Sequence, residues 1–155
     1  MPELIHIGSD HAGLDLKNAL KTHLEARGFT IRDHGAHSPE STDYPLYAQG
    51  VCQAVFAENG RGILICGTGI GMSIAANRNR GIRAALCACE FHARACREHN
   101  NANILCLGSR ITATGLAASI LDIFLDTPFA GGRHQGRIEL IENAMREPLC
   151  SCTIP

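Results

Sequence analysis

Residues 62–77, GILICGTGIGMSIAAN, decide the fold of this chain. The run at 63–65 is continuously apolar, which is typical of a strand buried on both faces. It ends at Cys66 and a loop with three glycines in five residues, and a helical pattern follows from Met72. Glycines let the backbone approach a ligand closely, and a helix start presents free N–H groups. The stretch therefore predicts an anion-binding loop beside a cysteine.

This loop differs from two common phosphate-binding motifs. A Walker A loop needs Lys followed by Ser or Thr after its last glycine, and the dinucleotide fingerprint has another glycine spacing. By itself, a glycine-rich turn after a strand can also be only a tight connection to the next helix. The choice between an anion hole and a plain turn depends on the rest of the chain.

Strand and helix patterns alternate on both sides of this stretch. The expected strands are 4–8, 29–32, 63–65, 82–88 and 104–107, and the expected helices are 14–28, 47–58, 72–77, 90–98, 114–125 and 139–146. This alternation predicts an α/β fold: a three-layer α/β/α sandwich around a doubly wound parallel sheet of five strands, Rossmann- or flavodoxin-like. We expect a single domain over 1–147 and a C-terminal tail at 148–155.

Composition narrows the class of protein. The chain has 155 residues, a formal net charge of −1 and no long run of Lys or Arg, so neither nucleic acid nor a membrane surface is an expected partner. The first residues lack a leader pattern, and no apolar run approaches the roughly 20 residues of a spanning helix. We expect a soluble, cytoplasmic protein.

The eight cysteines do not have the spacing of a metal site. Cys52, Cys87, Cys96 and Cys106 lie in apolar stretches, where free cysteine behaves as a small buried hydrophobe. The Cys-x-Cys pairs at 87–89 and 150–152 lack the two-residue spacer of zinc knuckles and thioredoxin-like motifs. We expect no metal.

In a parallel sheet, ligands bind beyond the carboxyl ends of the strands. This rule brings together Asp10 and His11 after the first strand, the loop at 66–71 after the third, and Ser109 and Arg110 after the fifth. Two further polar groups lie elsewhere. They are His99-Asn100, at the end of a helix, and Arg133 with Arg137, whose spacing could clamp a phosphate or belong to a solvated turn.

Taken together, these motifs resemble the type B ribose-5-phosphate isomerases and the related subunits of galactose-6-phosphate isomerase, along nearly the whole chain. The matching pieces are GSDHAG at 8–13, TDYP at 42–45, ICGTGIG at 65–71 with AAN after it, HN at 99–100, GSR at 108–110 and GGRHQxR at 131–137. The resemblance implies an aldose–ketose isomerase that needs no cofactor and moves a proton between C1 and C2 of the open-chain sugar through an enediolate.

The resemblance also implies a role for each candidate residue. Cys66 would be the base, since in one branch of the family the catalytic cysteine stands at this position, at the end of the third strand. Another branch uses a carboxylate shortly after the loop, which is absent here, where Met72 and Ser73 follow Gly71. Thr68 would relay a proton, and His99 with Asp10 would open the sugar ring. The remaining substrate contacts would come from the N–H groups of Gly67, Thr68, Gly69, Ile70 and Gly71, from Asn100 and Tyr44, and, for the phosphate, from His11, Arg110, Arg133 and Arg137.

Members of that family are homodimers or dimers of dimers with sites at the subunit interface, so His99, Asn100 and Arg110 are expected to serve the site of the partner subunit. Two other classes remain open at this point: a sugar-phosphate-binding module without catalysis, and a redox protein that uses its cysteines. Within the isomerase class, the substrate could also be a six-carbon phosphosugar such as allose 6-phosphate or galactose 6-phosphate.

Overall fold

The computed structural model describes residues 3–144, and the expected tail at 148–155, with Cys150 and Cys152, lies outside them. Its five strands are all parallel: β1 (Leu4–Ser9), β2 (Thr30–Asp33), β3 (Arg61–Cys66), β4 (Ala84–Leu86) and β5 (Ile104–Gly108). The strand order is β2-β1-β3-β5-β4, so β3 occupies the centre of the sheet. The apolar run that the sequence analysis placed in a buried strand is this central one.

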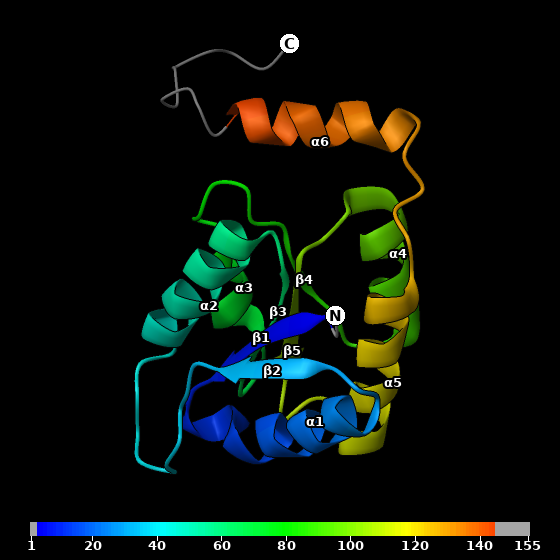
Figure 1. The fold of residues 1–155 in the computed structure, drawn as a ribbon. Helices are drawn as coiled ribbons and strands as arrows, with labels where there is room; N and C mark the ends of the chain where they lie inside the picture. Colours follow the sequence, from blue (N-terminus) through cyan, green and yellow to red (C-terminus); the bar gives the residue numbers. More distant parts are fainter. Residues whose placement is uncertain (1–2, 145–155) are drawn as a thin grey trace.

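Helices cover both faces of the sheet, as expected for a doubly wound α/β fold. On one side lie α1 (Leu14–Ala26), α4 (Glu90–Asn100) and α5 (Thr114–Asp126), and on the other α2 (Tyr44–Glu58) and α3 (Ile70–Ala76) (Figure 1). Side chains of β3 alternate between the two layers: Ile63 and Ile65 pack toward the first, Leu64 and Cys66 toward the second. This alternation aims the Cys66 side chain at the α2/α3 layer.

Several element boundaries differ from the sequence-based expectation. The strand expected at 82–88 is only Ala84–Leu86, and it forms one edge of the sheet. Helix α2 begins at Tyr44, because Pro45 fits the first turn of a helix, where its missing N–H has no partner to lose. Helix α4 continues to Asn100, which places His99 and Asn100 in its last turn. Helix α3 begins at Ile70, directly after the glycine loop.

The last helix, α6 (Arg133–Ala144), also begins earlier than the expected 139. The sequence around Gly136 is polar and carries a glycine, which favours a loop. Instead Arg133 and Arg137 lie on adjacent turns of one helix. In Figure 1 this helix lies apart from the two helical layers, and its contacts with the rest of the fold run chiefly to α4.

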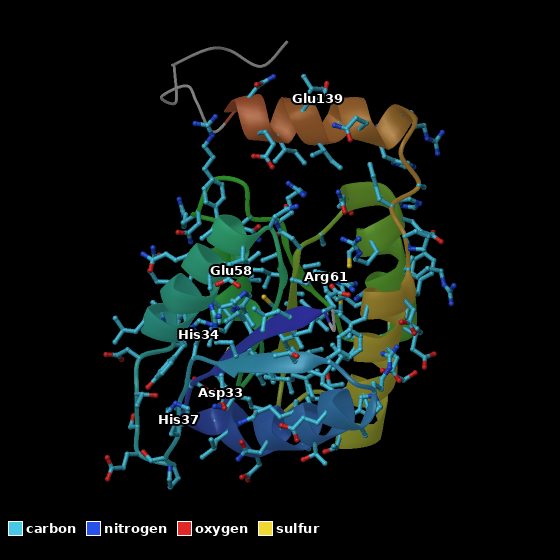
Figure 2. The ribbon with its side chains drawn as sticks, viewed as in Figure 1. Asp33, His34, His37, Glu58, Arg61 and Glu139 are labelled. Atoms are coloured by element: carbon cyan, nitrogen blue, oxygen red, sulfur yellow. The ribbon has the colours of Figure 1, made fainter. Side chains whose placement is uncertain are left out.

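A buried histidine links three elements at the β2 edge of the sheet. The His6 side chain is fully buried, its Nδ1 lies 3.1 Å from His34 Nε2, and its Nε2 lies 3.4 Å from a Glu58 oxygen. Figure 2 labels both partners: His34, which follows β2, and Glu58, the last residue of α2. Burial, the leading cause, lowers the pKa of His6 and of His34 below 6.5, with the positive charge of Arg32 adding to it, while Glu58 acts in the opposite direction. The folded protein thus holds both rings neutral.

This arrangement predicts a loss of stability in mild acid. Below pH about 6.5 His6 and His34 bind protons in the unfolded chain but stay neutral in the folded chain. The free energy of unfolding therefore falls as the pH drops toward the folded-state pKa values. Urea unfolding at pH 7.5 and 5.0 measures the slope. A His6→Phe variant is expected to flatten it, whereas a variant of the exposed His37 is expected to keep it.

No helix among residues 3–144 is long and apolar enough to cross a membrane. Cys52, Cys87, Cys96 and Cys106 are buried, as the apolar stretches around them predict, and each is a free thiol.

Candidate active site

Three loops meet at the carboxyl ends of β1, β3 and β5. The N–H of Asp10 donates to the carbonyl of Ile65 at 3.2 Å, and the N–H of Ser109 donates to the carbonyl of Cys66 at 2.9 Å. The Ser109 hydroxyl also donates to the carbonyl of Ala12 at 2.7 Å. These bonds extend the sheet pairing past the last strand residues, so the loops that the sequence analysis grouped at this edge are held together.

Cys66 is the last residue of β3, and its side chain is buried at 5% exposure. Its sulfur accepts a hydrogen bond from the N–H of Gly69 at 3.2 Å. The loop thus curls back over the thiol and directs a backbone donor at it. The sulfur is therefore held in a fixed position at the start of the loop.

Two of the loop glycines are required by space or backbone angle. Gly69 has φ +78°, and a Cβ there would lie 2.5 Å from Leu86 Cδ1. A Cβ on Gly71 would lie 2.5 Å from the ring of Tyr44, which packs directly over the loop from the start of α2. The absence of a side chain at Gly71 therefore lets the Tyr44 ring pack against the loop.

Asp10 and His11 follow β1, and hydrogen bonds fix the orientation of both side chains. An Asp10 carboxylate oxygen accepts from the N–H of Gly13 at 3.1 Å and so caps the short 3-10 helix His11–Gly13. The Nδ1 of His11 accepts from the N–H of Thr42 at 3.2 Å. In the neutral ring the proton then sits on Nε2, which leaves that nitrogen as the donor for an anion.

Arg110 lies over the loop of its own chain. Its N–H donates to the carbonyl of Gly67 at 3.0 Å, and its guanidinium carbon and nitrogens come within 3.2–3.4 Å of the point where a Gly67 Cβ would stand. Whether Arg110 also serves the partner's site, as expected for His99 and Asn100, stays a prediction. In this chain Arg110 joins the group at the carboxyl ends of the strands.

We call this group the loop cluster. It consists of Asp10, His11, Tyr44, the loop residues Cys66, Gly67, Thr68, Gly69, Ile70 and Gly71, and Arg110. A hollow of about 240 Å³ lies beside it, lined by Thr68, Ile70, Leu86 and Ile111 among others. Small-molecule sites usually measure about 300 Å³ or more, so this hollow has the size of part of a site.

The other candidate residues gather at the opposite end of the sheet. Helix α4 follows β4 and runs back to the amino ends of the strands, so His99 and Asn100 lie near the start of β5. The His99 ring stacks on His134 of α6, with ring centroids 4.5 Å apart and planes 14° from parallel. The basic cluster, as we name it, consists of His99, Asn100, Arg133, His134 and Arg137. Within one chain the basic cluster and the loop cluster therefore lie apart, at opposite ends of the sheet.

His134 is a member that the sequence analysis assigned no role. Desolvation first, then the positive charges of His99, Arg133 and Arg137, lower its pKa below 6.5. In the sequence, the only signal for His134 was its place between Arg133 and Arg137 in the GGRHQxR motif. Its contact with His99 depends on how α6 packs on α4, which no local pattern encodes.

Among residues 3–144, no three His, Cys, Asp or Glu side chains are grouped closely enough to hold a metal ion.

Comparison with known proteins identifies relatives over nearly the whole chain. A family model described as ribose/galactose isomerase matches residues 5–141. The ribose-5-phosphate isomerase B of Escherichia coli (strain K12) is 48% identical over 138 residues, which are 88% of this chain and 93% of that protein.

Solved structures agree in fold as well as sequence. A ribose 5-phosphate isomerase from Thermotoga maritima is 53% identical with a TM-score of 0.89, over 91% of this chain and 98% of that one. The ribose-5-phosphate isomerase B of Mycoplasma genitalium, solved with bound ribulose-5-phosphate, is 42% identical with a TM-score of 0.92, over 96% of this chain and 99% of that one.

Proposed function

The chain belongs to the ribose/galactose isomerase family, and on that premise we propose that it interconverts ribose 5-phosphate and ribulose 5-phosphate through an enediolate, with Cys66 as the base. The observation that carries this assignment is the buried Cys66 sulfur at the mouth of the glycine loop, accepting the N–H of Gly69. A binding module needs no thiol at its anion hole. A redox protein that uses its cysteines predicts a reactive disulfide pair instead, and mass spectrometry that finds only free thiols in the freshly purified protein would exclude that class.

The reaction moves one proton between neighbouring carbons. The Cys66 thiolate removes the proton from C2 of the open-chain aldose, the electron pair forms the C1–C2 double bond, and the aldehyde oxygen becomes the enediolate oxygen. Return of the proton from Cys66 to C1 gives the ketose. The loop at 67–71 is proposed to supply N–H donors to the developing oxyanion, a contribution of about 3 kcal/mol per donor. In this structure the N–H groups of Gly69 and Ile70 bond Cys66 Sγ and Thr68 Oγ1 instead.

Thr68 is proposed to carry the hydroxyl proton between O1 and O2. Its side chain is exposed, and its oxygen accepts the N–H of Ile70 at 3.3 Å. That bond occupies a lone pair and leaves the hydroxyl proton free to donate to a substrate oxygen. Tyr44, packed over Gly71, bounds the space in which the sugar lies.

Ring opening and phosphate binding are proposed to use both clusters. His99, helped by Asp10, acts as acid on the ring oxygen, and Asn100 holds a sugar hydroxyl. His11, Arg110, Arg133 and Arg137 bind the phosphate, whose negative charge suits several cationic donors. These assignments require the loop cluster and the basic cluster in one site.

We therefore propose a homodimer in which the basic cluster of one subunit completes the loop cluster of its partner. The separation of the two clusters to opposite ends of one sheet supports this. Exposed apolar side chains around the loop, Ile70, Ile74 and Ile111, support burial against another subunit, and a dimer of dimers is compatible with the same surfaces. The free thiols suit a reducing compartment, for which we propose the cytoplasm.

The direct test is turnover of ribose 5-phosphate by the purified protein in EDTA, because proton transfer through an enediolate can run on side chains alone. Ribulose 5-phosphate formation is expected. Allose 6-phosphate and galactose 6-phosphate are assayed in parallel, and a higher kcat/KM on either would replace the five-carbon assignment. Binding of ribose 5-phosphate without turnover of any of the three would point to a binding module.

A further inference from the structure

Arg83 holds together the two helices that carry the basic cluster. It directly precedes β4, and its Nε donates to the carbonyl of Asn100 at 3.0 Å and to that of Asn101 at 3.1 Å, at the end of α4. Its Nη1 donates to the Glu142 carboxylate of α6 at 2.7 Å. A single guanidinium thus ties the edge strand to the ends of both helices.

Helix α6 has few other anchors. Among the described residues of α6, Ile138 is the only one that is buried, while Leu140 and Ile141 are exposed. The His99–His134 stack near its start and the Arg83–Glu142 ion pair near its end are its specific contacts. The angle of α6 against α4, and with it the position of Arg133 and Arg137 relative to His99 and Asn100, therefore depends on Arg83.

The Arg83–Glu142 pair is sufficiently shielded from solvent to fix the position of α6 relative to α4. The two side chains are 20% and 24% exposed, so solvent screens the pair less than it would an ordinary surface pair. The planar fork of an arginine addresses two directions at once from N–H groups of fixed geometry, whereas the rotatable ammonium of a lysine fixes the two partners less well. The positive charge also lies at the carboxyl end of α4, where the helix dipole favours it.

We propose that Arg83 is a positioning residue of the isomerase. It touches no substrate, and it sets the distance between the ring-opening acid on α4 and the phosphate-binding arginines on α6. This inference rests on the proposed function. It adds a residue that lies outside every motif of the site and acts on the site of the partner subunit.

Kinetics of an Arg83→Met variant give the first measurement. The loss of both helix contacts is expected to lower kcat/KM for ribose 5-phosphate about 100-fold, as a displacement of about 1 Å in a positioned group does. Arg83→Lys should recover part of this. Glu142→Gln removes the ion pair with α6 alone and should raise KM about fivefold with kcat nearly unchanged, since only phosphate binding is affected.

Arg61 offers a matched control at the same end of the sheet. It is 18% exposed, binds the Glu3 carboxylate at 2.6 Å and the carbonyl of Leu125 at 2.5 Å, and among residues 3–144 it makes no hydrogen bond or ion pair with α4 or α6. An Arg61→Met variant should melt at a lower temperature and keep its kinetic constants. If Arg83→Met and Glu142→Gln behave in the same way as Arg61→Met, Arg83 is merely structural and the proposal is wrong.

A mixed dimer separates positioning from damage to the fold. Arg83→Met chains retain their own loop cluster, and Cys66→Ala chains retain a native basic cluster. A heterodimer of the two contains one native site and should recover about half of wild-type activity if Arg83 acts only through the basic cluster. No recovery here, together with recovery in a Cys66→Ala/His99→Asn heterodimer, would overturn the role of Arg83 and leave the proposed function standing. No recovery in either heterodimer would contradict the proposal that the active site is shared between two subunits.

Discussion

A Cys66→Ala variant is expected to lose isomerase activity by about 10³-fold, within the 10²–10⁴ range of a positioned acid–base group. The alanine keeps the backbone of the loop and its donors but removes the atom that accepts the C2 proton. Side-chain loss at this nearly buried position should cost only about 1 kcal/mol of stability. Turnover of ribose 5-phosphate and a melting curve of the same sample measure the two effects.

Cys52→Ala is the control for this experiment. Cys52 is buried on α2, in the same layer that Cys66 faces, and burial raises the pKa of its thiol to about 11, so it stays protonated at neutral pH. Its replacement should leave turnover unchanged. A Cys66→Ala variant that retains full activity would show that another group is the base, and the site assignment would then have to be rebuilt around Asp10 or His11.

The sequence was sufficient for the features that depend on local pattern. The apolar run before Cys66, the glycines after it and the regular alternation of strands and helices predicted the parallel α/β fold, which the structure confirms. The rule for carboxyl ends of parallel strands correctly brought Asp10, Cys66 and Arg110 to one edge. These predictions succeed because strand direction and loop position follow from the order of elements alone.

Features that depend on long-range packing could not be read in the same way. The position of β5 between β3 and β4 depends on which strand faces best fit the helices, and the sequence order does not encode it. Helix α6 begins at Arg133 because packing on α4 overrides the low helix propensity around Gly136. Arg83 follows an ordinary glycine-isoleucine pair, and only its contacts with Asn100 and Glu142 give it a role.

The division of the site between two chains leads to the second large effect. A Cys66→Ala dimer has no base in either site, and a His99→Asn dimer lacks the ring-opening acid in both, so each is expected to be at least about 100-fold less active than the wild type. In a heterodimer of the two, Cys66 of the His99→Asn chain meets the partner's His99. That site is native in every residue, while the second site carries both substitutions.

Co-expression with two different affinity tags and sequential purification yields the heterodimer, which should show about half of wild-type activity. This recovery cannot arise if each chain builds its own site, because every site in the mixture would then contain one defect, and the activity would equal the mean of the two inactive homodimers. A heterodimer as inactive as its parents would therefore contradict the shared site, and with it the argument from the two ends of the sheet. Recovery would establish that the loop cluster and the basic cluster lie far apart in one chain because each active site combines clusters from two subunits.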